Sequence, residues 1–159
     1  MPINGITAKP ASSPDVSNDA FFDSVDEMVG QLADGFTSWA RDELRTVLVA
    51  LDGVGGDPAG LHDVSKQLFT TMHDLKGQAG TFGFDLLSEI GGSLCEHLRD
   101  MTEPPPPKQA EIMRLHIMAA MFVLDRNLTG NDRQIWDQFR TKRDALIAAA
   151  DLPENDSAT

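Results

Sequence analysis

Residues 61–84 contain the side chains of this sequence that are best placed to do chemistry. On a helix with about 100° per residue, His73 lies opposite the apolar stripe and therefore faces water. Lys76 follows three residues later on the same side, where its ammonium group can reach a group attached to the imidazole. An exposed imidazole is a nucleophile, and a neighbouring cation stabilises an anionic group such as a phosphoryl group. The pair predicts a site at which the ring of His73 takes up a charged group.

Two glycines share this face of the predicted helix. Gly77 comes one turn after His73, and Gly80 comes about two turns after it. A glycine inside a helix costs roughly 1 kcal/mol relative to alanine, so the close approach of a partner surface is a physical reason for their presence. The alternative is that they make room for a neighbouring helix of the same protein. The expected docking residues on this face are Lys66, Phe69, Thr70, Gly77, Gly80 and Phe84.

The elements that position this face are all predicted to be helices. Apolar residues recur mostly three or four positions apart, and alternating β-branched runs are missing. We predict an up-and-down antiparallel four-helix bundle, because short loops between helices favour antiparallel neighbours. An additional N-terminal helix precedes the bundle if Gly30 and Gly35 divide the first helical stretch. The predicted helices cover residues 19–51, 60–82 and 85–101, with a fourth ending near residue 128 and a fifth near residue 150.

Local signals mark several boundaries of these helices. Gly83 is the expected stop of the second helix, and Asp85 is the expected N-cap of the third. Four prolines at 104–107 prevent the third helix from continuing and form a stiff connector. We expect one helical domain over residues 19–150, between a disordered polar tail at 1–18 and an acidic tail at 151–159. The expected apolar positions of the fourth helix are Ile112, Leu115, Met118, Phe122 and Leu124.

Composition excludes several classes of function. The formal net charge of −12 repels phosphate backbones, and the sequence contains no basic stripe, so we expect no nucleic-acid partner. No apolar run approaches the length of a membrane span, and we expect no membrane association. The sequence contains a single cysteine, Cys95, which permits no internal disulfide. A cytoplasmic protein, monomeric because the His73 face suits a transient partner, is the resulting expectation.

Residues 73–77 read His-Asp-Leu-Lys-Gly and are followed by Ala79, Phe82 and Gly83. This pattern closely resembles the signature of the histidine-containing phosphotransfer (HPt) domain family, which is H-x-x-K-G, a small residue and an apolar-glycine pair. The signature is complete within residues 72–84, and the helices across 19–150 resemble the four-helix bundle of the family.

The resemblance implies that His73 accepts and donates a phosphoryl group without any kinase activity of the protein itself. The implied partners are receiver domains of response regulators, which supply the Mg²⁺, and a histidine kinase. Many members carry a polar residue on the next helix that orients the histidine. Here that helix offers Cys95 and Arg99, and Arg99 could add a second cation near the phosphate. A surface arginine and a packed cysteine are the alternative readings of these two residues.

Other functions are less well supported by the residues. His62 and His73 are too far apart on one helix for a single ion, and Cys95, His97 and His116 form no compact ligand set, so we expect no metal site. The sequence has no P-loop, nucleophile motif or kinase glycine box. The serious alternative is a protein with the same fold that docks and inhibits a histidine kinase or receiver without being phosphorylated.

Overall fold

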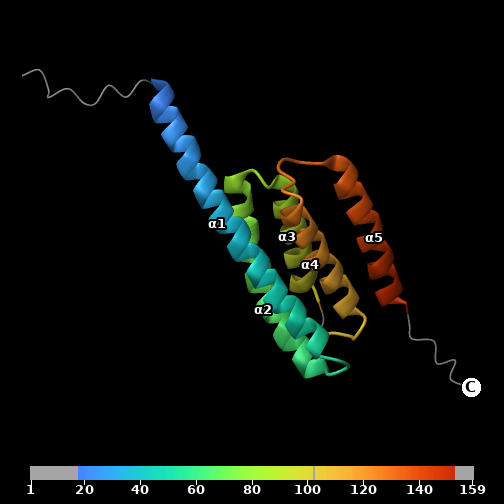
Figure 1. Cartoon of the computed structure of the whole chain (residues 1–159). Helices are drawn as coiled ribbons and strands as arrows, with labels where there is room; N and C mark the ends of the chain where they lie inside the picture. Colours follow the sequence, from blue (N-terminus) through green and yellow to red (C-terminus); the bar gives the residue numbers. More distant parts are fainter. Residues whose placement is uncertain (1–17, 102, 153–159) are drawn as a thin grey trace, which may run out of the picture. The chain divides into compact units, whose positions relative to one another are not determined.

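A computed structural model describes residues 18–101 and 103–152 of the chain. This part of the chain is all helical, with five α-helices, one short 3₁₀ helix (η1) and no strand (Figure 1). Nearly all of the two tails predicted at 1–18 and 151–159 lies outside the described residues. The elements are α1 (Asn18–Gly53), α2 (Pro58–Ala79), η1 (Gly80–Phe82), α3 (Asp85–Arg99), α4 (Gln109–Asp125) and α5 (Arg133–Asp151).

Helix α1 belongs to both of the two compact units into which the chain divides. The first unit ends at Gly35 and the second begins at Phe36. The helix nevertheless continues from Asn18 to Gly53 without a break. The expectation that Gly30 and Gly35 separate an additional N-terminal helix is therefore wrong. Each glycine costs only about 1 kcal/mol relative to alanine, which is too little to interrupt a long helix.

The second unit is built around one hydrophobic core. From residue 36 onward, α1 contributes buried residues three or four positions apart, the spacing of a single helical face. Helix α2 packs on α3, α3 packs on α4, and α4 packs on α5 (Figure 1). Two ion pairs, each 2.7 Å long, also join α1 to α4: Arg41 with Asp125, and Asp52 with Arg114. The buried residues of α1 are Phe36, Ala40, Leu44, Val47 and Leu51.

The ends of α2 follow from local sequence. The Asp57 side chain caps its start by accepting a hydrogen bond from the Ala59 backbone N–H, and Pro58 occupies the first helical position. After η1, Gly83 adopts a φ of +80°, which confirms it as the stop and reverses the chain toward α3. Asp85 lies in the first turn of α3 and not at its cap. The N-cap position belongs to Phe84, which makes no side-chain capping bond.

The buried stripe of α4 differs from the predicted one. Ile112 and Leu124 are buried as expected, but Met118 and Phe122 are 53% and 43% exposed. The buried stripe includes His116, whose side chain is fully buried. Apolar residues occur on all sides of this helix, so the sequence pattern does not single out the buried face.

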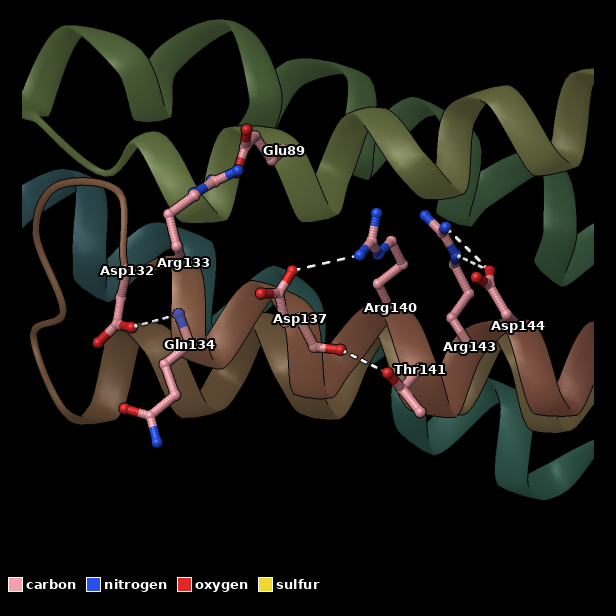
Figure 2. Close-up of polar contacts among 9 residues, drawn as sticks. All are labelled: Glu89, Asp132, Arg133, Gln134, Asp137, Arg140, Thr141, Arg143 and Asp144. Carbon is pink, nitrogen blue, oxygen red and sulfur yellow. Dashed lines mark hydrogen bonds and ion pairs between the residues drawn. The ribbon is translucent and has the colours of Figure 1, made fainter.

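Helix α5 packs on the core through apolar side chains and also makes polar contacts with α3. Asp132 caps its start by accepting bonds from the Gln134 and Ile135 backbone N–H groups. Phe139 is its one buried residue among those the structure describes. Figure 2 shows Arg133 reaching Glu89 of α3, and it shows Arg143 pointing from α5 toward the helices that α5 covers. No helix within 18–101 and 103–152 has the length and apolar character that crossing a membrane requires.

Candidate functional site

His73 lies on the exposed face of α2, as the periodicity of this helix predicts. Its neighbours Met72 and Leu75 are completely buried and hold that side of the helix against the core. The helix is therefore fixed by its apolar side, while the imidazole stands on its solvent side. This placement leaves the ring accessible to a molecule that approaches from outside.

Phe69 forms a platform beneath the imidazole. The two rings are nearly parallel, with 4° between their planes and 6.1 Å between their centroids. Arg99 of α3 lies over the same phenylalanine, with its guanidinium carbon 5.9 Å from the ring centroid, which is a cation–π contact. Phe69 thus connects the candidate nucleophile of α2 with a cation from α3 and restricts the orientation of both.

Cys95 is buried between α2 and α3. Its thiol donates a hydrogen bond to the Phe69 carbonyl oxygen, with 3.8 Å between sulfur and oxygen. Burial raises the pKa of the Cys95 thiol, while the positive charges of Lys76 and Arg99 act in the opposite direction. The thiol therefore stays protonated near neutral pH and holds the backbone beneath the aromatic platform.

Lys76 extends from α2 across a notch in α3. A Cβ added to Gly91 would lie 3.2 Å from the Met72 carbonyl oxygen and 3.3 Å from Lys76 Cβ. A Cβ added to Gly92 would lie 3.6 Å from Lys76 Cε and 3.8 Å from its Nζ. The pair Gly91–Gly92 therefore allows the two helices to approach closely. It also provides the surface along which the Lys76 side chain lies.

Gly77 and Gly80 face open space. A Cβ added to either residue would meet no atom within 4 Å among the residues that the structure describes. The alternative reading, that these glycines make room for another helix of the same protein, is therefore not supported. Because neither glycine has a side chain, nothing projects from the surface beside His73 at these positions, and a partner can approach the ring closely.

The remaining predicted docking residues divide into two groups. Lys66, Phe69 and Thr70 line a shallow groove of about 270 Å³, together with residues at the end of α3. Phe84 is only 2% exposed and lies against Phe36, with their ring centroids 6.0 Å apart. Its assignment to the docking surface is wrong, because the reversal of the chain at Gly83 turns its side chain into the core.

The contacts at Phe69 were not predicted from the sequence. Phe69 was predicted as a docking residue, but its stacking on His73 was not. The signal was present, because residues four positions apart on a helix lie one above the other. The Arg99 contact gives no such signal, since it depends on how α3 packs on α2. Among the residues that the structure describes, no group of three or more His, Cys, Asp or Glu side chains could hold a metal ion.

Comparison with protein families agrees with this geometry. A family model described as the Hpt domain matches residues 19–125, which is more than half of the chain. The chain therefore belongs to the Hpt domain family. The matched range covers α1 to α4 and ends before α5 begins. No curated protein and no solved structure gives a significant match.

Membership of this family assigns the chain to histidine phosphotransfer in two-component signalling. Hpt domains carry phosphoryl groups and are not kinases, and they interact with receiver domains and kinases. The resemblance to the HPt family that the sequence suggested is thereby confirmed.

Proposed function

We propose that the protein relays a phosphoryl group through His73, either between aspartates of receiver domains or from a histidine kinase to a receiver. The observation that carries this proposal is the exposed imidazole of α2, set on Phe69 and bordered by the open surface at Gly77 and Gly80. A carrier needs a nucleophile that two partners can reach in turn, and this position meets that requirement.

The transfer requires few changes in bonding. A lone pair of the neutral His73 ring, on Nε2, attacks the phosphorus of an aspartyl phosphate in the receiver. The N–P bond forms while the P–O bond to the aspartate breaks, and the carboxylate leaves as an anion. The reverse reaction returns the group to a second receiver. Since the attacking and leaving atoms must lie in line, docking geometry controls the rate.

The protein's own contribution is to orient the imidazole and to provide positive charge. Parallel stacking on Phe69 restricts rotation of the His73 ring. Lys76 and Arg99 place two cations on the α2–α3 side of the site, where they can stabilise the added negative charge. We propose that Mg²⁺ comes from the receiver, whose acidic pocket holds it, and that Lys66, Phe69, Thr70, Gly77 and Gly80 form the docking surface.

We further propose that α1 to α4 form the antiparallel four-helix bundle of the family. The family match ends at Asp125, α2 packs on α3 and α3 on α4, and two ion pairs join α1 to α4. On this reading α5 is an addition at the C-terminal side of the bundle. It replaces the additional N-terminal helix that the sequence suggested.

The test is transfer from a receiver that carries a radiolabelled aspartyl phosphate. We expect the label to appear on the protein in an acid-labile, base-stable linkage and to map to His73. The variant His73→Gln should lose the label completely, because an amide is not a nucleophile, while its thermal stability stays close to that of the wild type. Label that persists in this variant would show that another residue accepts the group.

The alternative is that the protein docks a kinase or receiver and inhibits it without being phosphorylated. The presence of His73, Lys76 and Gly77 together argues against it, since inhibition requires none of the three. The same experiment separates the two readings. A wild-type protein that binds several phosphorylated receivers and remains unlabelled would favour the inhibitor.

A further inference from the structure

The first unit carries an apolar stripe that the described residues leave uncovered. Between Asn18 and Gly35, six apolar side chains of α1 are each between 36% and 60% exposed. They repeat at intervals of three and four residues, which places them on one helical face about 120° wide. The stripe consists of Phe21, Phe22, Val25, Met28, Val29 and Leu32.

Residues 18–35 have little intrinsic stability as a helix unless another surface packs on the stripe. It contains two glycines, Gly30 and Gly35, each of which costs roughly 1 kcal/mol relative to alanine. It has five acidic residues and no basic residue, so no Glu–Lys or Asp–Arg pair within it supports the helix. Most helical stability in proteins comes from packing of an apolar face. The stripe is therefore the part of the segment that can supply such stability, by burial against another surface.

The charge of the segment limits what can cover the stripe. An amphipathic helix that lies on an anionic membrane carries lysine or arginine on its polar face. Here the polar face bears acidic residues instead, so an anionic lipid surface would repel it. The acidic residues are Asp19, Asp23, Asp26, Glu27 and Asp34. With Val25 at zero, these five residues lie between about 100° and 200° around the helix, whereas the stripe lies within about 60° of zero. Two such segments can therefore pair through their stripes while their carboxylates remain in water.

We propose that residues 18–35 form a dimer interface in which the stripe of one chain covers the stripe of a second copy. If each stripe residue offers on the order of 100 Å² of exposed surface, two copies bury roughly 1,200 Å², at the lower end of the range of specific interfaces, which is about 1,200–2,000 Å². The same surface left in water on a monomer would equal the largest apolar patches that monomers tolerate. The sequence alone led us to expect a monomer, on the ground that the His73 face receives a transient partner. The stripe belongs to α1, so dimerisation uses none of the docking residues of α2.

Sedimentation equilibrium of the full chain, at loading concentrations from about 1 to 100 μM, measures the association. We expect the wild type to be mainly dimeric at the upper end of this range. Replacing two stripe residues, Val25→Glu with Leu32→Glu, should raise the dimer dissociation constant by roughly a hundredfold, because each dimer would bury four unpaired carboxylates. The control Ser24→Glu with Gln31→Glu adds the same charge to the same helix outside the stripe, and it should remain dimeric.

Hydrogen exchange provides a second measurement on the same samples. The amides of residues 21–34 should be protected in the wild type at high concentration and should exchange rapidly in the stripe variant, while the amides of α2 and α3 change little. A wild type that stays monomeric at about 100 μM would overturn the proposal. A stripe variant that dimerises as the wild type does would overturn it as well, and so would a control that dissociates to the same extent.

Discussion

Two histidines of the second unit occupy opposite environments. His73 stands on the solvent side of α2, with one face of its ring on Phe69. His116 lies on α4 and is completely buried, with its ring edge against Phe139 at 5.0 Å between centroids. His116 Nδ1 donates a hydrogen bond to the Ile112 carbonyl oxygen at 2.7 Å. Since a carbonyl can only accept, this contact places the proton on Nδ1 and leaves Nε2 as the acceptor.

The Nε2 atom of His116 is occupied as well. It lies 3.0 Å from Ser93 Oγ, which donates to it, and Ser93 Oγ in turn accepts a bond from Arg143 Nη1 at 2.9 Å. The chain of contacts joins α3, α4 and α5. A partner can reach an imidazole lone pair only where the ring is exposed, and His116 offers no such access. At His116 the same ring serves as a connector between helices.

The largest effect we predict distinguishes His116 from His73 and concerns how the free energy of unfolding depends on pH. Burial, together with the nearby charges of His97 and Arg143, lowers the pKa of His116 from 6.5 to about 4. In the unfolded chain this ring takes up a proton near pH 6.5, so between pH 6.5 and 4 the unfolded state binds more protons than the folded state. The free energy of unfolding should therefore fall as the pH drops through this window. The loss attributable to His116 is on the order of 3 kcal/mol.

Denaturant titrations at several pH values check this prediction, with His116→Gln as the comparison. That variant should be less stable than the wild type at pH 7 by about 1–3 kcal/mol, because it disturbs the Ser93 and Ile112 contacts. Its stability should depend less on pH between 6.5 and 4, and it should still accept phosphate on His73. Equal pH dependence in both proteins would mean that His116 is not the titrating group.

A smaller effect should follow from filling the open surface beside His73. The variant Gly77→Gln should slow transfer from a phosphorylated receiver by about tenfold or more, equivalent to roughly 1.4 kcal/mol in the barrier, because the new side chain obstructs docking. Its stability should be equal to or greater than that of the wild type, since glutamine is the better helix former. Rapid-quench kinetics of label transfer provide the measurement.

The matched control for this variant is Gly30→Gln. Gly30 is also a helical glycine whose added Cβ meets nothing within 4 Å, but it belongs to α1 and not to the face of His73. The variant Gly30→Gln gains the same helix propensity as Gly77→Gln and should leave the transfer rate unchanged. Transfer by Gly77→Gln at the wild-type rate would contradict the argument from close approach.

The sequence predicted the face of α2 correctly because that helix is regular from Pro58 to Ala79. Over such a run, angular position follows from residue number, so the exposure of His73 could be worked out by counting. The counting fails at Gly83, where a φ of +80° reverses the chain. Phe84 therefore enters the core beside Phe36, which lies 48 positions earlier in the sequence.

The contacts between helices also could not be predicted from helical periodicity. The positions of Cys95 and Arg99 on α3 were predictable, but not that both would contact Phe69, because this depends on the depth at which α3 packs on α2. In α4, apolar residues occur on all sides, so the pattern could not single out the buried face. Pattern reasoning recovers a face, whereas the partners across an interface depend on the packing of both surfaces.

The smallest effect we predict concerns Lys76, and it tests whether the site around His73 stabilises phosphate as well as admitting a partner. Lys76 extends along Gly92 of α3, so the cation is held near the α2–α3 interface. The variant Lys76→Ala should shorten the lifetime of the phosphorylated protein by about threefold, which corresponds to less than 1 kcal/mol and is typical of a partly exposed charge pair. The control Lys66→Ala removes a lysine from the same helix two turns before His73 and should leave the lifetime unchanged. The lifetime of each phosphorylated variant is measured on the purified, labelled protein as the loss of acid-labile label with time. If the two variants decay at the wild-type rate, the positive charge beside the imidazole has no part in holding phosphate, and the stacked ring and open surface must account for the function by themselves.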